Sequence, residues 1–147
     1  MKENVVWIFF YGTFMSAAVL AEHGVQAQTV VPARLNGFKL TIRPRVNLTR
    51  NETACVYGSV AAVTPEGIAA LYAQLEVQFG LKYLPQAVIA ETRDSMLCPA
   101  LCYIAPFMQD QAAADDYLQE LADCARELGH PASYVAYIES HKLKAPI

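Results

Sequence analysis

The order of apolar and polar residues along the chain predicts strands and helices that interleave irregularly. Five short runs either are rich in β-branched and aromatic residues or alternate apolar with polar residues, as strands do. The other segments suit helices, by apolar repeats at three- and four-residue spacing or by capping residues at their ends. This pattern predicts an α+β fold with a mixed or barrel-like sheet. The predicted strands are residues 5–10, 38–43, 55–63, 84–91 and 100–104, and the predicted helices begin at residues 16, 65, 115 and 131.

The uncharged segment from Val5 to Ala21 has two interpretations. Behind Lys2, its apolar character is typical of a signal peptide, and its length is close to that of a membrane-spanning helix. Residues 11–13, Tyr-Gly-Thr, interrupt it in the middle. The first half favours a strand and the second half a helix, so we interpret the segment as a strand, a tight turn and a helix.

Length and composition indicate one domain over residues 1–147. Hydrophobic residues make up 54% of the chain and charged residues 17%, which excludes intrinsic disorder. The formal net charge of −3 argues against a nucleic-acid binder. None of the four cysteines forms a CxxC pair, so we interpret them as buried apolar residues of a cytoplasmic protein with no membrane partner. With so many apolar residues, part of the exposed surface is expected to be apolar and could pair two copies of the chain in a homodimer.

The turn at residues 11–15 is the first candidate for a binding site. Gly12 lets the backbone bend and approach a ligand closely. The amides that follow begin a helix, where unpaired N–H groups can hold an anion such as a carboxylate. The alternative is an ordinary strand-to-helix turn.

Glu76 is the candidate for acid–base chemistry. It follows Leu75 near the end of the predicted helix, at the edge of its apolar stripe. A carboxylate that loses hydration there would have a raised pKa, as a general acid or base near neutral pH requires. The alternative is a partly exposed glutamate at a helix end, which is the commoner environment for this residue type.

Five segments in order resemble the gamma-glutamylcyclotransferase family and its AIG2-like relatives over nearly the whole chain. The similarities are a Tyr-Gly-Thr turn, a second strand, a Val-x-Gly-x-Val strand, an acidic residue seven positions before a tyrosine, and a late helix. In this sequence the segments are residues 9–15, residues 33–40, residues 56–60, Glu76 with Tyr83, and residues 117–134. The resemblance implies a mixed β-sheet curled into a small barrel with flanking helices.

The resemblance also implies an activity: release of 5-oxoproline from a gamma-glutamyl compound, with no metal or cofactor. The α-amine of the substrate would attack its own γ-carbonyl, with Glu76 as general base and then general acid. Backbone amides of Gly12, Thr13, Phe14 and Met15 would hold the α-carboxylate, and Tyr11 would line the pocket. Tyr83 and Tyr117 would contact the substrate or Glu76.

Two departures from the family pattern leave an alternative open. Val77 replaces the family's glycine after the acidic residue, and Phe14 stands where many members have Asn or Leu. A catalytically silent module that binds a small ligand would keep the fold and lose the chemistry. A Glu76 side chain that points away from the cavity would favour this alternative.

Overall fold

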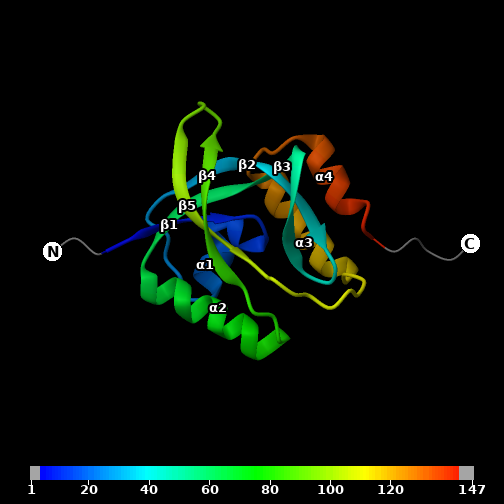
Figure 1. Cartoon of the computed structure of the whole chain (residues 1–147), viewed down its shortest axis with the longest axis horizontal. Coiled ribbons are helices and arrows are strands. Elements are labelled where there is room, and N and C mark those ends of the chain that lie inside the picture. Colours follow the sequence, from blue (N-terminus) through cyan, green and yellow to red (C-terminus); the bar gives the residue numbers. More distant parts are fainter. Residues whose placement is uncertain (1–3, 143–147) are drawn as a thin grey trace, which may run out of the picture.

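A computed structural model describes residues 4–142 of the chain. A closed barrel in the order β1-β3-β2-β4-β5 forms its centre (Figure 1). All neighbouring strands are antiparallel except β1 and β5, which run parallel and meet at Ile8 and Leu101. The strands are β1 (Val6–Phe10), β2 (Val30–Ile42), β3 (Val46–Val63), β4 (Leu84–Thr92) and β5 (Leu97–Ile104). This architecture confirms the predicted α+β class and the small barrel.

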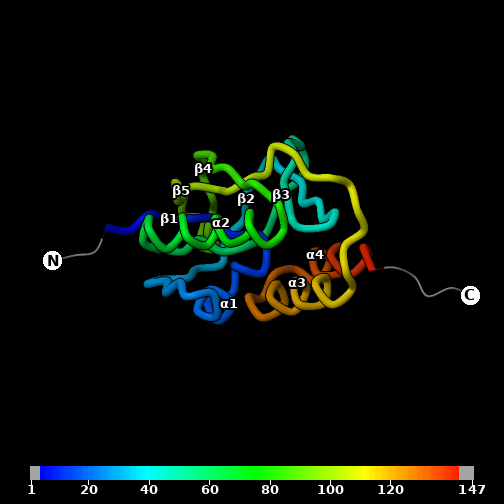
Figure 2. The backbone as a smooth tube through the Cα atoms, turned by 90° about the horizontal axis from the view of Figure 1, so that it is seen from below, coloured from blue at the N-terminus to red at the C-terminus, as the bar shows by residue number. Residues whose placement is uncertain are grey.

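The helices flank the barrel on two sides. In Figure 2, α2 (Pro65–Phe79) runs along the barrel, and α1 (Ala17–Glu22), α3 (Asp115–Glu127) and α4 (Ala132–Glu139) form a layer beside it. A short 3-10 turn, η1 (Thr13–Met15), joins β1 to α1, so the Val5–Ala21 segment forms the expected strand, turn and helix. In the described part of the chain, no helix is long and apolar enough to cross a membrane.

The hairpin of β2 and β3 is longer than the sequence pattern predicts. Pairing extends to its tip, where Ile42 lies opposite Val46. The predicted strand at 55–63 is only the second half of β3, because residues 49–53 are polar and give no apolar signal. Val46 and Leu48 are nevertheless buried, which is the two-residue alternation of a half-buried strand.

Gly58 permits the close contact between β1 and β3. A Cβ atom built at this position would lie 1.9 Å from the carbonyl oxygen of Phe10. Any other residue would therefore force the two backbones apart. Phe10 ends β1 directly before the turn at residues 11–13, so this contact also fixes where the turn lies.

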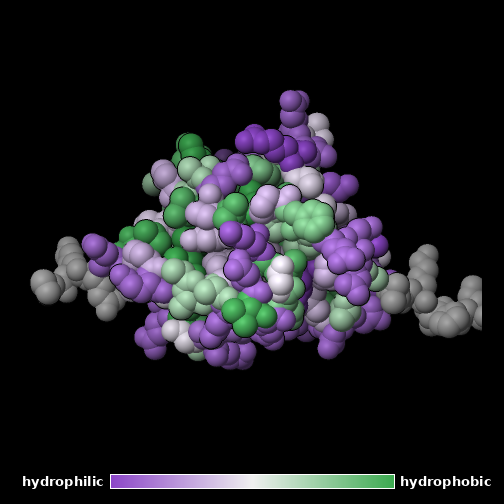
Figure 3. Space-filling model, turned by 60° about the horizontal axis from the view of Figure 1, so that its bottom comes forward, coloured by the Kyte–Doolittle hydropathy of each residue, from purple (hydrophilic) through white to green (hydrophobic). Residues whose placement is uncertain are grey.

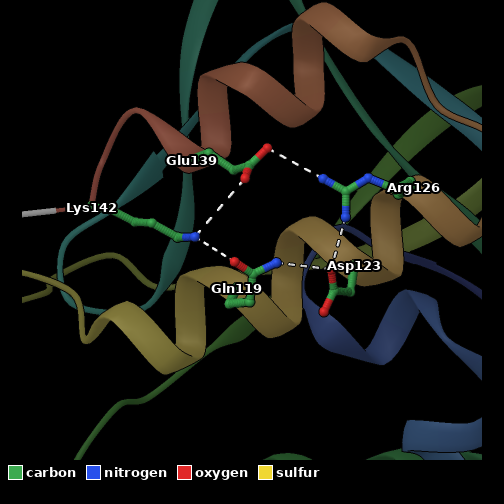
Figure 4. Close-up of polar contacts among 5 residues, drawn as sticks. All are labelled: Gln119, Asp123, Arg126, Glu139 and Lys142. Carbon is green, nitrogen blue, oxygen red and sulfur yellow. Dashed lines mark hydrogen bonds and ion pairs between the residues drawn. The ribbon is translucent and has the colours of Figure 1, made fainter.

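A surface network of polar side chains links α3 to α4 (Figure 4). Arg126 donates hydrogen bonds to Asp123 over 2.8 Å and to Glu139 over 3.3 Å. Lys142 contacts Gln119 and lies 3.9 Å from Glu139. Beneath it the two helices bury apolar side chains, so the network closes the outside of a packed interface.

Large apolar side chains also remain on the surface. They are spread over several elements, and Figure 3 shows apolar residues among polar ones on the face that α2 crosses. The most exposed are Val77, Phe107, Leu97, Met96 and Ile89. A homodimer stays a prediction, because exposed apolar residues alone do not identify an interface.

Candidate active site

A pocket of about 210 Å³ lies where the end of β1, the tip of the β2–β3 hairpin, α2 and α3 meet. Aromatic side chains dominate its wall. Six of the residues that the sequence analysis selected line it, namely Tyr11, Gly12, Thr13, Phe14, Tyr83 and Tyr117. The other lining residues are Phe10, Val19, His23, Arg45, Val46, Tyr72, Leu75, Gln78, Phe79, Leu81 and Glu120.

Gly12 forms the floor of the pocket together with Val46. A Cβ atom at Gly12 would lie 2.8 Å from a methyl group of Val46, so glycine is required for space. The φ of Gly12 is −101°, which any residue can adopt. The carbonyl of Gly12 accepts from the Met15 amide over 2.9 Å, which starts η1 and leaves the Thr13 and Phe14 amides as first-turn donors.

The backbone amide of Met15, which was expected to help hold the carboxylate, donates its hydrogen bond to the carbonyl oxygen of Gly12 over 2.9 Å. The Met15 side chain is fully buried in the core and does not line the pocket. Its carbonyl oxygen accepts a 2.9 Å hydrogen bond from the hydroxyl of Ser59. Met15 is apolar and ends η1, so it packs inward while the two preceding residues face the cavity.

The tyrosine hydroxyls bind backbone groups of the protein. Tyr83 donates to the carbonyl of Val46 over 2.6 Å, and the amide of Val46 donates to the hydroxyl of Tyr117 over 3.4 Å. Tyr11 donates to the carbonyl of Tyr103 over 2.6 Å. These hydroxyls position the pocket wall. Among residues 4–142 neither Tyr83 nor Tyr117 has a hydrogen bond to Glu76, and their contact with a substrate stays a prediction.

Packed aromatic rings form one buried side of the pocket. Tyr72 stacks on Tyr103 with ring centroids 4.0 Å apart, and its ring lies 5.7 Å from that of Tyr83. Burial raises the pKa of Tyr72, Tyr11 and Tyr83 well above the usual tyrosine value, so these hydroxyls stay protonated. Phe14 adds edge-to-face contacts with His23 and Tyr72.

Comparison of the sequence with known protein families shows which family the chain belongs to. The sequence profile of the gamma-glutamyl cyclotransferase, AIG2-like family matches residues 8–123, which include the turn, the barrel and most of α3. The chain belongs to this family. Among curated proteins, no sequence matches it significantly.

Solved structures of gamma-glutamyl cyclotransferases share the fold. One aligns over 93% of this chain and 88% of its own, with a TM-score of 0.76 and 17% identity. An uncharacterized protein from Homo sapiens aligns over 99% and 92%, with a TM-score of 0.79 and 16% identity. A yeast gamma-glutamyl cyclotransferase specific to glutathione aligns over 95% and 96%, with a TM-score of 0.66 and 12% identity.

Glu76 lies outside the pocket of this gamma-glutamyl cyclotransferase-family chain. Its side chain is exposed, although the sequence analysis expected it to lose hydration at the edge of the apolar stripe. In α2, Glu76 lies far around the helix from Leu75 and Gln78 but next to Tyr72 and Phe79, four and three residues away, and all four of these residues line the pocket. The exposed Glu76 side chain therefore lies at the edge of the pocket-facing side of the helix. Val77 stands where the family has glycine, and α2 continues through it to Phe79.

Two charged residues at the pocket are absent from the sequence prediction. Arg45 comes from the tip of the β2–β3 hairpin, and Glu120 lies one turn after Tyr117 on α3. Glu120 is the one Asp or Glu of residues 4–142 that lines this pocket. Neither residue has a local motif, because each reaches the pocket only through packing of distant segments.

The described residues offer no metal centre to the family pocket. Within residues 4–142, no three His, Cys, Asp or Glu side chains gather as a metal site requires. Cys102 and Cys124 are buried, as predicted, whereas Cys55 and Cys98 are half-buried, so the prediction of four buried cysteines is wrong for these two. Burial raises the pKa of the Cys102 and Cys124 thiols to about 12 and about 11, which makes them poor nucleophiles.

Proposed function

We propose that the chain is a cytoplasmic enzyme that converts a gamma-glutamyl compound into 5-oxoproline and a free amine. The observation that carries this proposal is the small aromatic pocket closed by the Gly12 turn, in a chain of the gamma-glutamyl cyclotransferase family. A cavity of about 210 Å³ has room for a glutamyl group. The first-turn amides of Thr13 and Phe14 would receive its α-carboxylate.

The proposed reaction is an intramolecular acyl transfer. The neutral α-amine attacks the γ-carbonyl carbon, and a C–N bond forms that closes a five-membered ring. The bond from that carbon to the leaving nitrogen then breaks, and the nitrogen takes up a proton. A pocket that folds the glutamyl chain back on itself supplies the proximity that such a step requires.

One carboxylate can remove the ammonium proton and return it to the leaving nitrogen. We assign this role to Glu76, on its match to the family's acidic residue seven positions before Tyr83. Since Glu76 is exposed in the folded helix, the assignment requires either its side chain to turn toward the neighbouring Tyr72 and Phe79 of the pocket wall or the last turn of α2 to open. Glu120, which lines the pocket, is the competing carboxylate.

The test is release of 5-oxoproline from a panel of gamma-glutamyl amides by wild type, Glu76→Gln and Glu120→Gln. We expect the wild type to turn over at least one amide, and Glu76→Gln to lose at least a hundredfold in kcat. Loss in Glu120→Gln alone would transfer the role to Glu120. Equal turnover by all three proteins would remove both carboxylates from the mechanism.

A silent binding module is the second candidate, and the exposed position of Glu76 is the observation that favours it. Such a module would bind gamma-glutamyl compounds through the same Gly12 turn and leave them intact. Calorimetry that shows binding, together with mass spectrometry that shows no 5-oxoproline after prolonged incubation, would favour the module over the enzyme.

A further inference from the structure

A second cavity, of about 290 Å³, lies apart from the active-site pocket and shares no lining residue with it. Its wall comes from β2, β3, the end of β4, the turn after β4 and the turn between α3 and α4. We call it the polar cavity, because the residues that line it include Arg34, Tyr57, Glu91, Arg93, Gly129 and His130.

The charged groups of the polar cavity leave one positive charge unmatched. Arg34 donates to Glu91 over 2.9 Å, so these two charges neutralise each other. Arg93 donates instead to the carbonyl oxygen of Leu128, and it forms no ion pair within residues 4–142. Asp94, the next residue along the chain, does not line the cavity. The cavity is therefore suited to a ligand with a single negative charge.

The guanidinium of Arg93 lies against the turn between α3 and α4. A Cβ atom built at Gly129, where φ is +76°, would lie 3.2 Å from a terminal nitrogen of Arg93. The bond to the Leu128 carbonyl comes from one terminal nitrogen, so other N–H groups of the guanidinium remain for an acceptor. The main chain of this turn therefore holds a cation at the wall of the polar cavity.

His130 has an unpaired ring nitrogen at the same cavity. The residue is 8% exposed, and its Nε2 lies 2.9 Å from the carbonyl oxygen of Gly58. A carbonyl only accepts, so Nε2 carries the proton and Nδ1 of the neutral ring keeps a lone pair. Within residues 4–142 Nδ1 has no hydrogen bond, and the Tyr134 hydroxyl is the one fully enclosed side-chain N or O atom without a partner. Nδ1 is therefore reached from the cavity and calls for a donor.

The His130 ring is held in place and uncharged. Its centroid lies 5.3 Å from that of Tyr57 and 6.5 Å from that of Tyr134. Burial lowers the pKa of His130 to about 4, so the ring is neutral near pH 7. His130 thus adds an acceptor to the polar cavity and no second positive charge, which suits a donor group and disfavours a dianion such as phosphate.

We propose that the polar cavity binds a small monocarboxylate that has a hydroxyl or N–H group next to its carboxyl group. Arg93 receives the carboxylate, and Nδ1 of His130 accepts a hydrogen bond from the neighbouring donor. Neither residue lines the active-site pocket, so the site does not depend on the proposed function. Gly58, which holds His130, contacts Phe10 directly before the Gly12 turn, so the new site adjoins backbone that positions the active-site pocket.

Three matched ligands separate the two contacts. Lactate has the carboxylate and the hydroxyl, propionate lacks the hydroxyl, and lactamide lacks the charge. The ring signals of the three histidines report binding by NMR, because His130 lines the polar cavity, His23 lines the active-site pocket and His141 lines neither. At constant ionic strength near pH 7, we expect lactate to shift the His130 signals to saturation. Propionate should bind several-fold more weakly, and lactamide about tenfold or more weakly.

The same spectra contain the outcomes that would overturn the proposal. The His23 and His141 signals should stay unchanged at the lactate concentration that saturates His130. A parallel shift of His23 would place the ligand in the active-site pocket, and equal shifts of all three histidines would indicate a salt effect. Equal affinity for the three ligands, or tighter binding of inorganic phosphate than of lactate, would also reject the proposed ligand class.

Arg93→Gln tests the carboxylate contact, and Arg50→Gln is the matched control. Arg93→Gln should weaken lactate binding about tenfold and bring it to the affinity of lactamide. Arg50 is exposed, has no ion pair within residues 4–142 and lines neither cavity, so its removal should leave the affinity for lactate unchanged. A preference for lactate over lactamide that survives in Arg93→Gln would overturn the role of Arg93. So would equal weakening of both ligands, which indicates a merely structural effect.

Discussion

The hydroxyl of Tyr83 donates a 2.6 Å hydrogen bond to the carbonyl oxygen of Val46. These residues are 37 positions apart, one just before β4 and the other at the start of β3. Because the amide of Val46 also reaches Tyr117, two tyrosines hold the backbone on which Arg45 lies. The hydroxyls thus fix the backbone position of Arg45 at the pocket.

Replacing Tyr83 by Phe should loosen this support. Loss of the bond to Val46 is expected to lower the free energy of unfolding by about 1 kcal/mol and to weaken binding of gamma-glutamylalanine. Tyr103→Phe is the control, because the Tyr103 hydroxyl makes no hydrogen bond within residues 4–142. Urea denaturation and calorimetry measure both effects, and equal values for the two variants would contradict the role of Tyr83.

Val77→Gly should activate the enzyme if Glu76 must leave the helix to act. Val77 is 89% exposed, so its removal costs almost no packing. Glycine weakens the last turn of α2 by about 0.5 kcal/mol relative to valine. We expect 5-oxoproline release to rise about twofold in Val77→Gly, to fall by a similar factor in Val77→Ala, because alanine strengthens the helix, and to vanish when Glu76→Gln is added. A gain that persists without Glu76 would refute the assignment.

Gly58→Ala should destabilise the whole barrel. The added methyl group would lie 1.9 Å from the carbonyl oxygen of Phe10, and neither strand can move without breaking its pairing. The expected loss is about 3 kcal/mol or more in the free energy of unfolding. Gly37→Ala, whose φ is +86° in open space, should lose only about 1 kcal/mol in the same denaturation experiment.

Acid should destabilise the fold through His130. Burial lowers the pKa of this histidine to about 4, and the Arg93 guanidinium acts in the same direction, against the 2.9 Å bond to the Gly58 carbonyl. In the unfolded chain the pKa of His130 is 6.5. Between pH 6.5 and pH 4 the unfolded chain therefore binds a proton at His130 that the folded chain does not bind. The contribution of His130 to the free energy of unfolding is fully present above pH 6.5 and decreases as the pH falls toward 4. About 2 kcal/mol is lost between pH 7 and pH 5.

His130→Gln tests this origin, because a side-chain amide can still donate to the Gly58 carbonyl but cannot titrate. Denaturation at pH 7 and pH 5 should show a smaller difference for the variant than for wild type. An identical difference would assign the acid sensitivity to other groups.

Arg126→Gln should weaken the link between α3 and α4. The arginine loses contacts with both Asp123 and Glu139, and these partly exposed pairs are worth about 0.5–1 kcal/mol together. Lys82→Gln removes an exposed charge that has no ion pair within residues 4–142. The difference between the variants in urea denaturation should shrink in 1 M salt, and a difference that salt leaves intact would rule out ion pairing as its source.

Local sequence patterns predict the elements of this protein well where burial is periodic or capping residues mark an end. Thr64 and Pro65 begin α2 as expected, and the Thr64 hydroxyl accepts the predicted bond from the Gly67 amide. The end of α2 is less predictable, because nothing between residues 76 and 79 stops the helix until Gly80 adopts φ of +68°. Because α2 continues to Phe79, Glu76 lies within the helix, at the edge of the side that faces the pocket.

The sequence alone determined the strand-turn-helix at the N-terminus, the barrel class, and the pocket residues Tyr11 to Phe14, because short-range spacing encodes them. Tertiary structure decided which residues from distant segments meet at the pocket. Arg45, Tyr117 and Glu120 come together only when the β2–β3 hairpin packs against α3, and Glu76 stays exposed at the edge of the pocket-facing side of α2. Such contacts depend on how distant elements pack, which the spacing of residues along one element does not specify.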